Sequence, residues 1–107
     1  MVINLKIKPL SVNEAWQGRR FKTKKYLSFE KEAILKMPFT KNAFKAPLTI
    51  DIIFGFSNSL CDIDNPLKPI LDCLQKRYGF NDRDIYELNV KKEIVKTGKE
   101  FIKIKIN

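Results

Sequence analysis

The chain has 107 residues, of which 44% are hydrophobic and 31% charged, and its net charge is +9. That length predicts one domain with a single core, and this composition excludes a disordered tail. The absence of histidine excludes Ser-His-Asp and Cys-His catalysis and most zinc-ligand sets. No apolar run approaches the roughly 20 residues of a membrane span, and the N-terminus lacks a secretory signal, so we expect a cytoplasmic protein. The positive charge favours a polyanionic partner, either nucleic acid or an anionic membrane surface.

The first half of the chain predicts a strand, a loop and a helix. Residues 3–8 alternate between apolar and polar side chains, which indicates a strand. Residues 10–27 have no clear period, so we expect a long loop there. Ser28 is the expected N-cap of a helix, because glutamates follow in the favourable first turn. Pro38 is expected to end that helix after about two and a half turns.

The middle of the chain contains the strongest strand and helix patterns. Residues 48–56 alternate cleanly and indicate a central strand, in which Gly55 marks a bulge or a close backbone approach. A helix is then expected, with Asn65 as its cap and Pro66 in the first helical position. An apolar stripe follows at helical spacing, and Gly79 suits the helix exit.

Two further strands are expected at the end of the chain. Residues 85–96 follow a turn, and residues 101–106 alternate after a two-residue Thr97-Gly98 turn. The expected order is β-α-β-α-β-β, which is an α+β fold: one domain over residues 1–107 in which two helices pack against a mixed sheet. Cys73 lies in the apolar stripe and is expected in the core, and both cysteines are expected to remain thiols.

Three aspartates are the strongest candidates for chemistry. Asp62 and Asp64 lie two residues apart before the second helix, so an extended backbone directs both side chains to one side. Asp82 follows that helix, which would bring the chain back toward the pair. Hard carboxylate oxygens suit Mg²⁺, and Lys68, in the first turn of the helix, is placed to reach a phosphate there. A metal ion and a lysine are a sufficient set for phosphodiester hydrolysis.

The same residues also allow purely structural interpretations. Acidic residues before a helix are ordinary N-terminal electrostatics. Lys68 and Asp72 stand four residues apart and suit a surface ion pair worth about 0.2–0.5 kcal/mol. Asp84 lies two residues beyond Asp82, so spacing alone leaves open which of the two supplies a third carboxylate.

The compound motif resembles the RusA family of Holliday-junction resolvases, most strongly over residues 50–90. The resemblance is carried by Asp62-Ile63-Asp64-Asn65, by Lys68 and Asp72, and by Asn81-Asp82 ahead of Ile85. Residues 9–13 are also similar to the family's proline-serine-asparagine opening. The chain departs from the family pattern in three places: Asn81 stands where an adjacent acid is usual, Asp84 is an additional acid, and residues 58–61 lack the arginines that some members have.

The resemblance implies a homodimeric, Mg²⁺-dependent endonuclease that nicks opposing strands of four-way DNA junctions in recombination and repair, with Mn²⁺ as the expected substitute. By position it implies that Asp62, Asp64 and Asp82 bind the metal and that Lys68 is the essential lysine. We expect supporting roles for Asn65, Asp72 and Asp84.

Basic and aromatic residues are interleaved in the predicted loop. The basic residues fall within seven positions and are Arg19, Arg20, Lys22, Lys24 and Lys25. We favour the interpretation that this loop contacts DNA, because the positive charge concentrates here. The alternative is a solvated loop that its aromatic residues anchor to the core. The main alternative for the whole chain is a non-catalytic nucleic-acid-binding domain whose aspartates only cap a helix.

Overall fold

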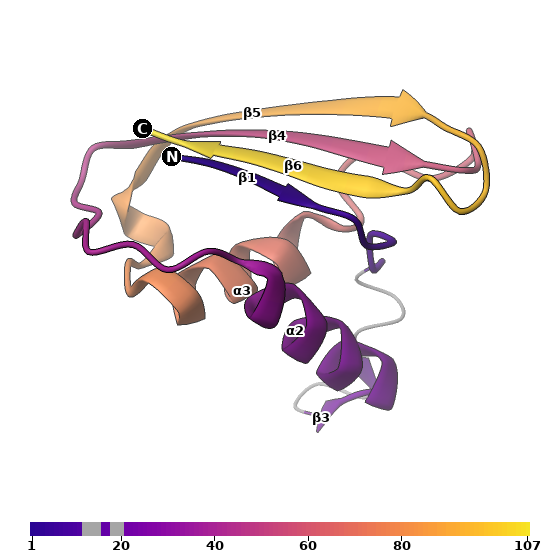
Figure 1. Ribbon diagram of the computed structural model, residues 1–107, viewed down its shortest axis with the longest axis horizontal. Helices are drawn as coiled ribbons and strands as arrows, with labels where there is room; N and C mark the ends of the chain where they lie inside the picture. The colour runs from indigo at the N-terminus through magenta and orange to yellow at the C-terminus, as the bar shows by residue number, and fades with distance from the viewer. Residues whose placement is uncertain (12–15, 18–20) are drawn as a thin grey trace.

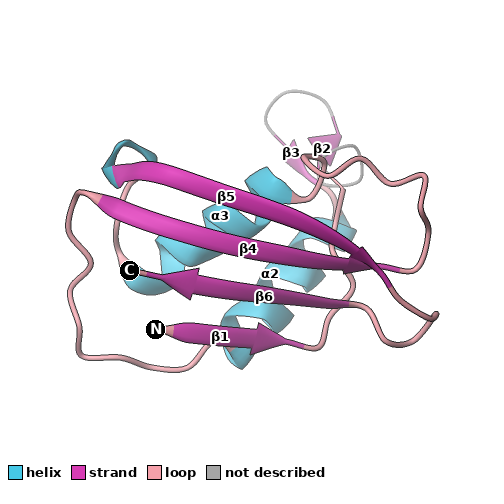
Figure 2. Cartoon of the chain, turned by 90° about the horizontal axis from the view of Figure 1, so that it is seen from above, coloured by secondary structure: helices cyan, strands magenta, loops and turns pink. Residues whose placement is uncertain are grey.

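The computed structural model describes residues 1–11, 16–17 and 21–107, in which two helices cover one face of a four-stranded sheet (Figures 1 and 2). The sheet order β1-β6-β4-β5 is formed by Val2–Leu5, Phe101–Ile106, Leu48–Phe56 and Ile85–Ile94. β6 is antiparallel to β1 and β4, whereas β5 is parallel to β4. The helices are α2 (Lys24–Lys36) and α3 (Leu67–Tyr78). This arrangement confirms the predicted α+β class and element order.

The core lies between the sheet and the helices, and the alternation along β4 provides its centre. Ile50, Ile52 and Phe54 are fully buried, and β6 alternates in the same way with isoleucines inward and lysines outward. Fully burying side chains of this size contributes about 1.5–3 kcal/mol each, which favours a central place for β4. Gly55 marks the close approach of a side chain rather than the expected bulge or backbone approach, because a Cβ there would collide with the ring of Phe101 on the neighbouring strand.

Helix α2 begins at Lys24, so the predicted N-cap at Ser28 is wrong. Thr23 is the cap, and its hydroxyl oxygen accepts the backbone N–H of Tyr26 at 3.1 Å. The side chain of Tyr26 is fully buried, and the early start places it in the core. Acidic residues are favoured in the first turn of a helix, but lysines occupy that turn here, so the charge pattern did not indicate where the helix begins. The helix ends ahead of Pro38, as expected.

Helix α3 begins at Leu67, and Pro66 occupies the N-cap position without a capping side chain, so the predicted Asn65 cap is wrong by one residue. The preceding backbone already forms turns, in which the N–H of Leu67 donates to the carbonyl oxygen of Asp64 at 3.1 Å. Such bonds satisfy amides that a capping side chain would otherwise serve. Gly79 ends the helix in the left-handed conformation, with φ 77° and its N–H bonded to Gln75, as predicted.

The Thr97-Gly98 turn connects two strands that do not pair with each other. The N–H of Lys99 donates to the carbonyl oxygen of Lys96 at 2.9 Å, which forms the predicted turn. β4 nevertheless lies between β5 and β6 in the sheet (Figure 2). A two-residue turn thus correctly predicted a local reversal here but gave no information about which strands become neighbours.

The loop predicted over residues 10–27 contains regular structure. β2 (Trp16–Gln17) pairs in antiparallel fashion with β3 (Phe21–Lys22), and α2 follows almost at once. Strands of two residues are too short to show a period in the sequence, so the pattern gave no sign of this ribbon. No helix in the described part of the chain is long and apolar enough to cross a membrane.

Candidate active site

The Asp62-Ile63-Asp64 segment lies in the loop between β4 and α3, and both carboxylates are exposed. Lys92 on β5 holds this loop in place. Its ammonium group donates to the carbonyl oxygens of Ser59 at 3.1 Å and Cys61 at 2.9 Å. The second of these carbonyls belongs to the residue immediately before Asp62. Lys92 therefore holds the loop between β4 and α3, which we call the acidic loop, against β5 at the edge of the sheet.

An open groove of about 500 Å³ lies between α3 and the first residues of β5. We call it the acidic groove; its lining residues are Asp64, Leu67, Lys68, Leu71, Asp82, Ile85, Tyr86, Glu87 and Leu88. The fold thus brings two of the predicted acids and the predicted lysine into one concave surface. Asp62 is exposed two residues before Asp64 but does not line the groove.

Asp82 is bound to α3 at a distance from the acidic loop. The side-chain N–H of Gln75 donates to Asp82 Oδ1 at 2.6 Å. Gln75 lies seven residues after Lys68, which corresponds to about 10 Å along the helix axis. Because Asp82 follows the C-terminal end of α3, whereas Asp62 and Asp64 precede its N-terminal end, the helix itself separates the acids. Within residues 1–11, 16–17 and 21–107, no three acidic or cysteine side chains form a group that could hold one metal ion.

Lys68 is connected to the core through Asp72. The Lys68 ammonium nitrogen lies 3.4 Å from Asp72 Oδ1, and the Tyr26 hydroxyl donates to Asp72 Oδ2 at 3.0 Å. Burial, followed by the hydrogen bond to Asp72, raises the pKa of Tyr26 well above its usual value. The Lys68 side chain remains 59% exposed and accessible to a ligand. Tyr26 on α2 therefore holds Asp72 in place, and Asp72 in turn pairs with Lys68 in the groove.

Asn65 and Asp84 lie outside the acidic groove. Asp84 Oδ2 accepts the backbone N–H of Asn81 at 2.9 Å and so stabilises the short 3₁₀-helix η1 (Asp82–Asp84). Of the two acids between which the spacing did not decide, Asp82 is the one that lines the groove. Asn65 lines a different hollow, which it shares with Lys8 and residues of the loop that precedes it.

The predicted DNA-contacting loop is only partly within the described residues, because Arg19 and Arg20 lie outside them. Lys22 is paired with Glu30 at 2.8 Å, and Glu30 also binds Lys76 at 2.7 Å. Burial would raise the pKa of Glu30, but hydrogen bonds from Lys22 and Lys76 outweigh it and lower that pKa. Lys22 therefore has a structural partner, which links the ribbon to α2 and α3.

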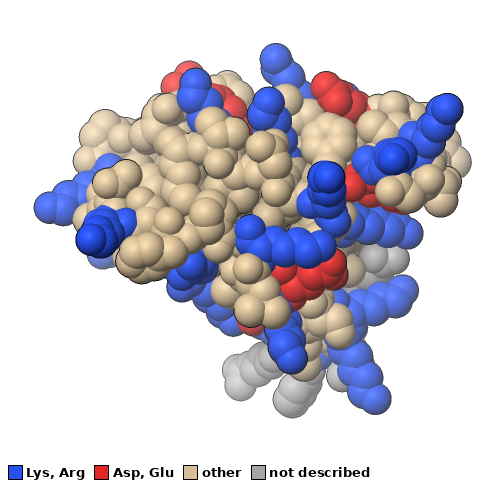
Figure 3. Space-filling model, in the orientation of Figure 1, with Lys and Arg blue, Asp and Glu red and all other residues tan. Residues whose placement is uncertain are grey.

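Lys24 and Lys25 are exposed at the start of α2. Basic side chains also project around most of the outline of the face in Figure 3, in both its sheet and its helical half. The positive surface of the described residues is thus broader than the predicted loop.

Comparison of the sequence with known protein families identifies a family for this chain. The model of the RusA endodeoxyribonucleases matches residues 11–107, essentially the whole chain. The chain belongs to the RusA family. Membership supports an endodeoxyribonuclease that acts on branched DNA. A search of curated proteins returned no significant match.

In this RusA-family chain, three residues near the acids were not assigned to the site from the sequence. Glu87 lines the groove, Gln75 binds Asp82, and Lys92 holds the acidic loop. Glu87 belongs to the groove-lining segment of β5 but not to the motif. Gln75 contacts an acid seven residues later in the chain, whereas Lys92 reaches a loop more than 30 residues before it. None of the three belongs to the compound motif. Helical spacing places Gln75 on the same face of α3 as Lys68 and Asp72, but nothing in the local sequence identifies Glu87 or Lys92.

Proposed function

We propose that the chain is a Mg²⁺-dependent endonuclease that nicks opposing strands of four-way DNA junctions, as a cytoplasmic homodimer in recombination and repair. The observation that carries the proposal is the acidic groove, which Asp64, Asp82 and Lys68 all line within the segment matched to the RusA family. Negative groups beside an exposed lysine, on a chain of net charge +9, suit a site that binds a phosphodiester together with a cation.

The donor chemistry fits a hard divalent ion. Mg²⁺ usually binds through one or two carboxylates and completes its shell with water and substrate phosphate, so a complete protein cage is not required. Asp62 and Asp64 would hold the ion, and Mn²⁺ would substitute. Asp82 would join them as the third ligand once its carboxylate leaves Gln75. When bound, the ion activates water and offsets negative charge on the phosphate.

The surrounding residues have separate tasks. The exposed ammonium group of Lys68 binds a non-bridging phosphate oxygen and stabilises the charge that develops there. Asp72, held by the buried hydroxyl of Tyr26, restricts where that ammonium group lies. Lys92 fixes the backbone directly before Asp62. These contacts preorganise the groove before DNA arrives.

The site is tested by comparing isosteric variants in a nicking assay on a labelled four-way junction. Asp64→Asn and Lys68→Met should each reduce nicking by at least about 100-fold, because each removes a charge that acts on the transition state. Asp64→Asn should retain or tighten junction binding, since a negative charge that faces phosphate is lost.

Asp51→Asn is the matched control. Asp51 lies on β4, does not line the groove, and accepts a hydrogen bond from Asn89 at 2.7 Å. This variant makes the same change in charge and should nick at close to the parental rate. Equal losses in Asp51→Asn and Asp64→Asn, or full activity in Asp64→Asn, would show that the groove is not the site.

A second function, a non-catalytic DNA-binding domain, is favoured by one observation. Asp82 is hydrogen-bonded to Gln75, and the described residues contain no three-carboxylate group for a metal. That function predicts tight junction binding with no nick under Mg²⁺ or Mn²⁺. Substitutions of the aspartates would then change affinity only.

A further inference from the structure

Tyr86, the second residue of β5, does not follow the alternation of its strand. Leu88 packs against the core, so counting back by two predicts residue 86 on the same face. The register with β4 shifts at this point, because Ile85 and Glu87 pair with consecutive residues of β4. Ile85 packs against the core, and Tyr86 is left as the extra residue of a bulge. Bulges often re-aim a side chain beside a functional site.

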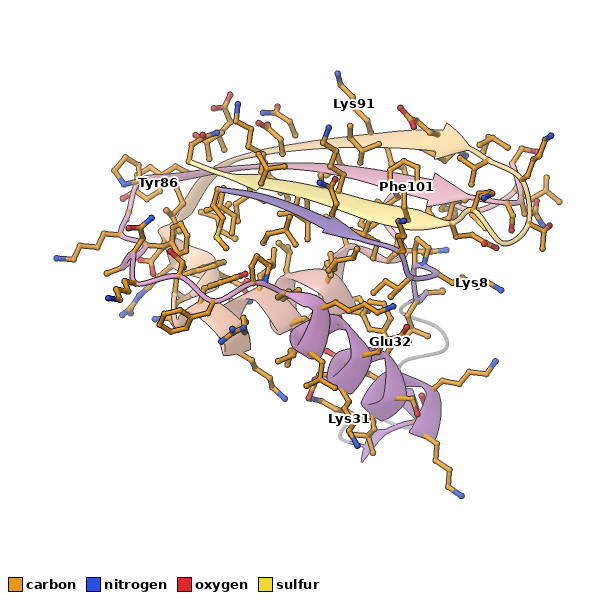
Figure 4. The ribbon with its side chains drawn as sticks, in the orientation of Figure 1. Lys8, Lys31, Glu32, Tyr86, Lys91 and Phe101 are labelled. Atoms are coloured by element: carbon orange, nitrogen blue, oxygen red, sulfur yellow. The ribbon has the colours of Figure 1, made fainter. Side chains whose placement is uncertain are left out.

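The re-aimed tyrosine lines the acidic groove. Tyr86 is 74% exposed, and it shares the groove with Asp64, Lys68 and Asp82. Figure 4 shows it at the end of the sheet where β5 begins, away from Lys91 further along the strand. The ring pairs formed among the described side chains involve other aromatic residues. The ring of Tyr86 therefore presents an uncovered face to solvent at the groove.

We propose that Tyr86 is a base-stacking residue: its ring binds a nucleobase that is unstacked at the branch point of a DNA junction, while the neighbouring phosphate lies at Asp64, Lys68 and Asp82. Every base has a π-face, so an exposed ring beside a phosphate-binding lysine suits this ligand without requiring a particular base. Apolar side chains that line the same groove, among them Leu67 and Leu71, offer the base a partly dehydrated surface. The inference rests on the proposed function, since it assigns a DNA contact to the same groove.

The test measures affinity for a labelled four-way junction in EDTA, so that binding is separated from cleavage. Tyr86→Leu keeps an apolar side chain but loses the ring, whereas Tyr86→Phe keeps the ring and loses the hydroxyl. One base–aromatic stack predicts that Tyr86→Leu binds roughly five- to 150-fold more weakly, while Tyr86→Phe stays close to the parental chain. Phe39→Leu is the matched control, because Phe39 is 72% exposed but does not line the groove.

Two further measurements separate stacking from other roles. On a junction with abasic nucleotides at the branch point, the difference between Tyr86→Leu and the parental chain should disappear. The dependence of affinity on salt should be unchanged in Tyr86→Leu, because no phosphate contact is lost.

Equal affinity of Tyr86→Leu and the parental chain would overturn the inference, as would equal losses in Tyr86→Leu and Tyr86→Phe. A change in oligomeric state of Tyr86→Leu, measured by light scattering, would show instead that the ring serves an interface between copies of the chain. The nuclease proposal can fail independently of this inference. If the parental chain shows the stacking effect in EDTA but makes no nick under Mg²⁺, the role of Tyr86 stands and the proposed nuclease activity is refuted.

Discussion

The partly buried hydrogen bond between Tyr26 and Asp72 should make a measurable contribution to stability. Tyr26→Phe removes the hydroxyl and leaves the ring in place, so no large cavity forms. A hydrogen bond to a charged acceptor contributes about 1.5–3 kcal/mol. The Asp72 side chain is 24% exposed, so water recovers part of that energy in the variant, and we expect a loss of about 1–2 kcal/mol.

Urea unfolding measures this loss as a lower midpoint with an unchanged slope, by roughly 0.5–1 M for a typical slope. Tyr78→Phe is the control: its hydroxyl donates to the neutral carbonyl oxygen of Pro38 in an exposed bond, so the loss should be smaller.

The alkaline limb of the stability curve gives an independent check. The pKa of Tyr26 is raised in the folded state, so its contribution is complete below the usual value of about 10 and is lost as the pH rises above it. Tyr26→Phe should therefore flatten that limb. Unfolding midpoints that agree within error between Tyr26→Phe and the parental chain, at neutral and alkaline pH alike, would refute this reasoning.

Three further substitutions test other contacts. Glu30→Gln should lower stability by about 1 kcal/mol at neutral pH. Because the pKa of Glu30 is lowered in the folded state, its contribution is present above the usual value of 4.5 and disappears as the pH falls. The melting temperatures of the variant and the parental chain should therefore converge in acid. Gly55→Ala should cost about 1–3 kcal/mol through collision with Phe101, and adding Phe101→Leu should recover part of that loss in denaturant unfolding. Lys92→Met should speed amide exchange in the loop at residues 57–64 and lower nicking by about 10–100-fold with little change in global stability; unchanged exchange would show that the lysine does not hold the loop.

The elements with strong local patterns were predicted well from the sequence. The alternation along Leu48–Phe56 matches the residues of β4, and Gly79 ends α3 as its type suggests. The starts of the helices were predicted less accurately, because the packing of side chains into the core can favour a different first residue from the one that local capping preferences indicate. Thr23 caps α2 under a lysine-rich first turn, since the helix must carry Tyr26 into the core. Strand neighbours could not be predicted either, because pairing depends on contacts between elements distant in sequence.

In the candidate site, too, the features within one local motif were predicted from the sequence, and those that depend on distant contacts were not. The motif predicted the acidic loop and Lys68, and the family comparison confirms the resemblance that the motif carried. The meeting of all three aspartates stays a prediction, because the length of α3 and the bond from Gln75 separate Asp82 from the loop. That separation depends on where the chain returns to the sheet, which no local spacing encodes.

Nicking of a synthetic four-way junction by the parental chain tests the central claim most directly. The junction carries a label on each strand and is incubated with Mg²⁺ or with EDTA beside a linear duplex of the same sequence. Paired nicks on opposing strands that require Mg²⁺, with the linear duplex left intact, are the predicted result. Tight binding to the junction with no nick under Mg²⁺ or Mn²⁺ would contradict the claim that this chain is an active junction endonuclease.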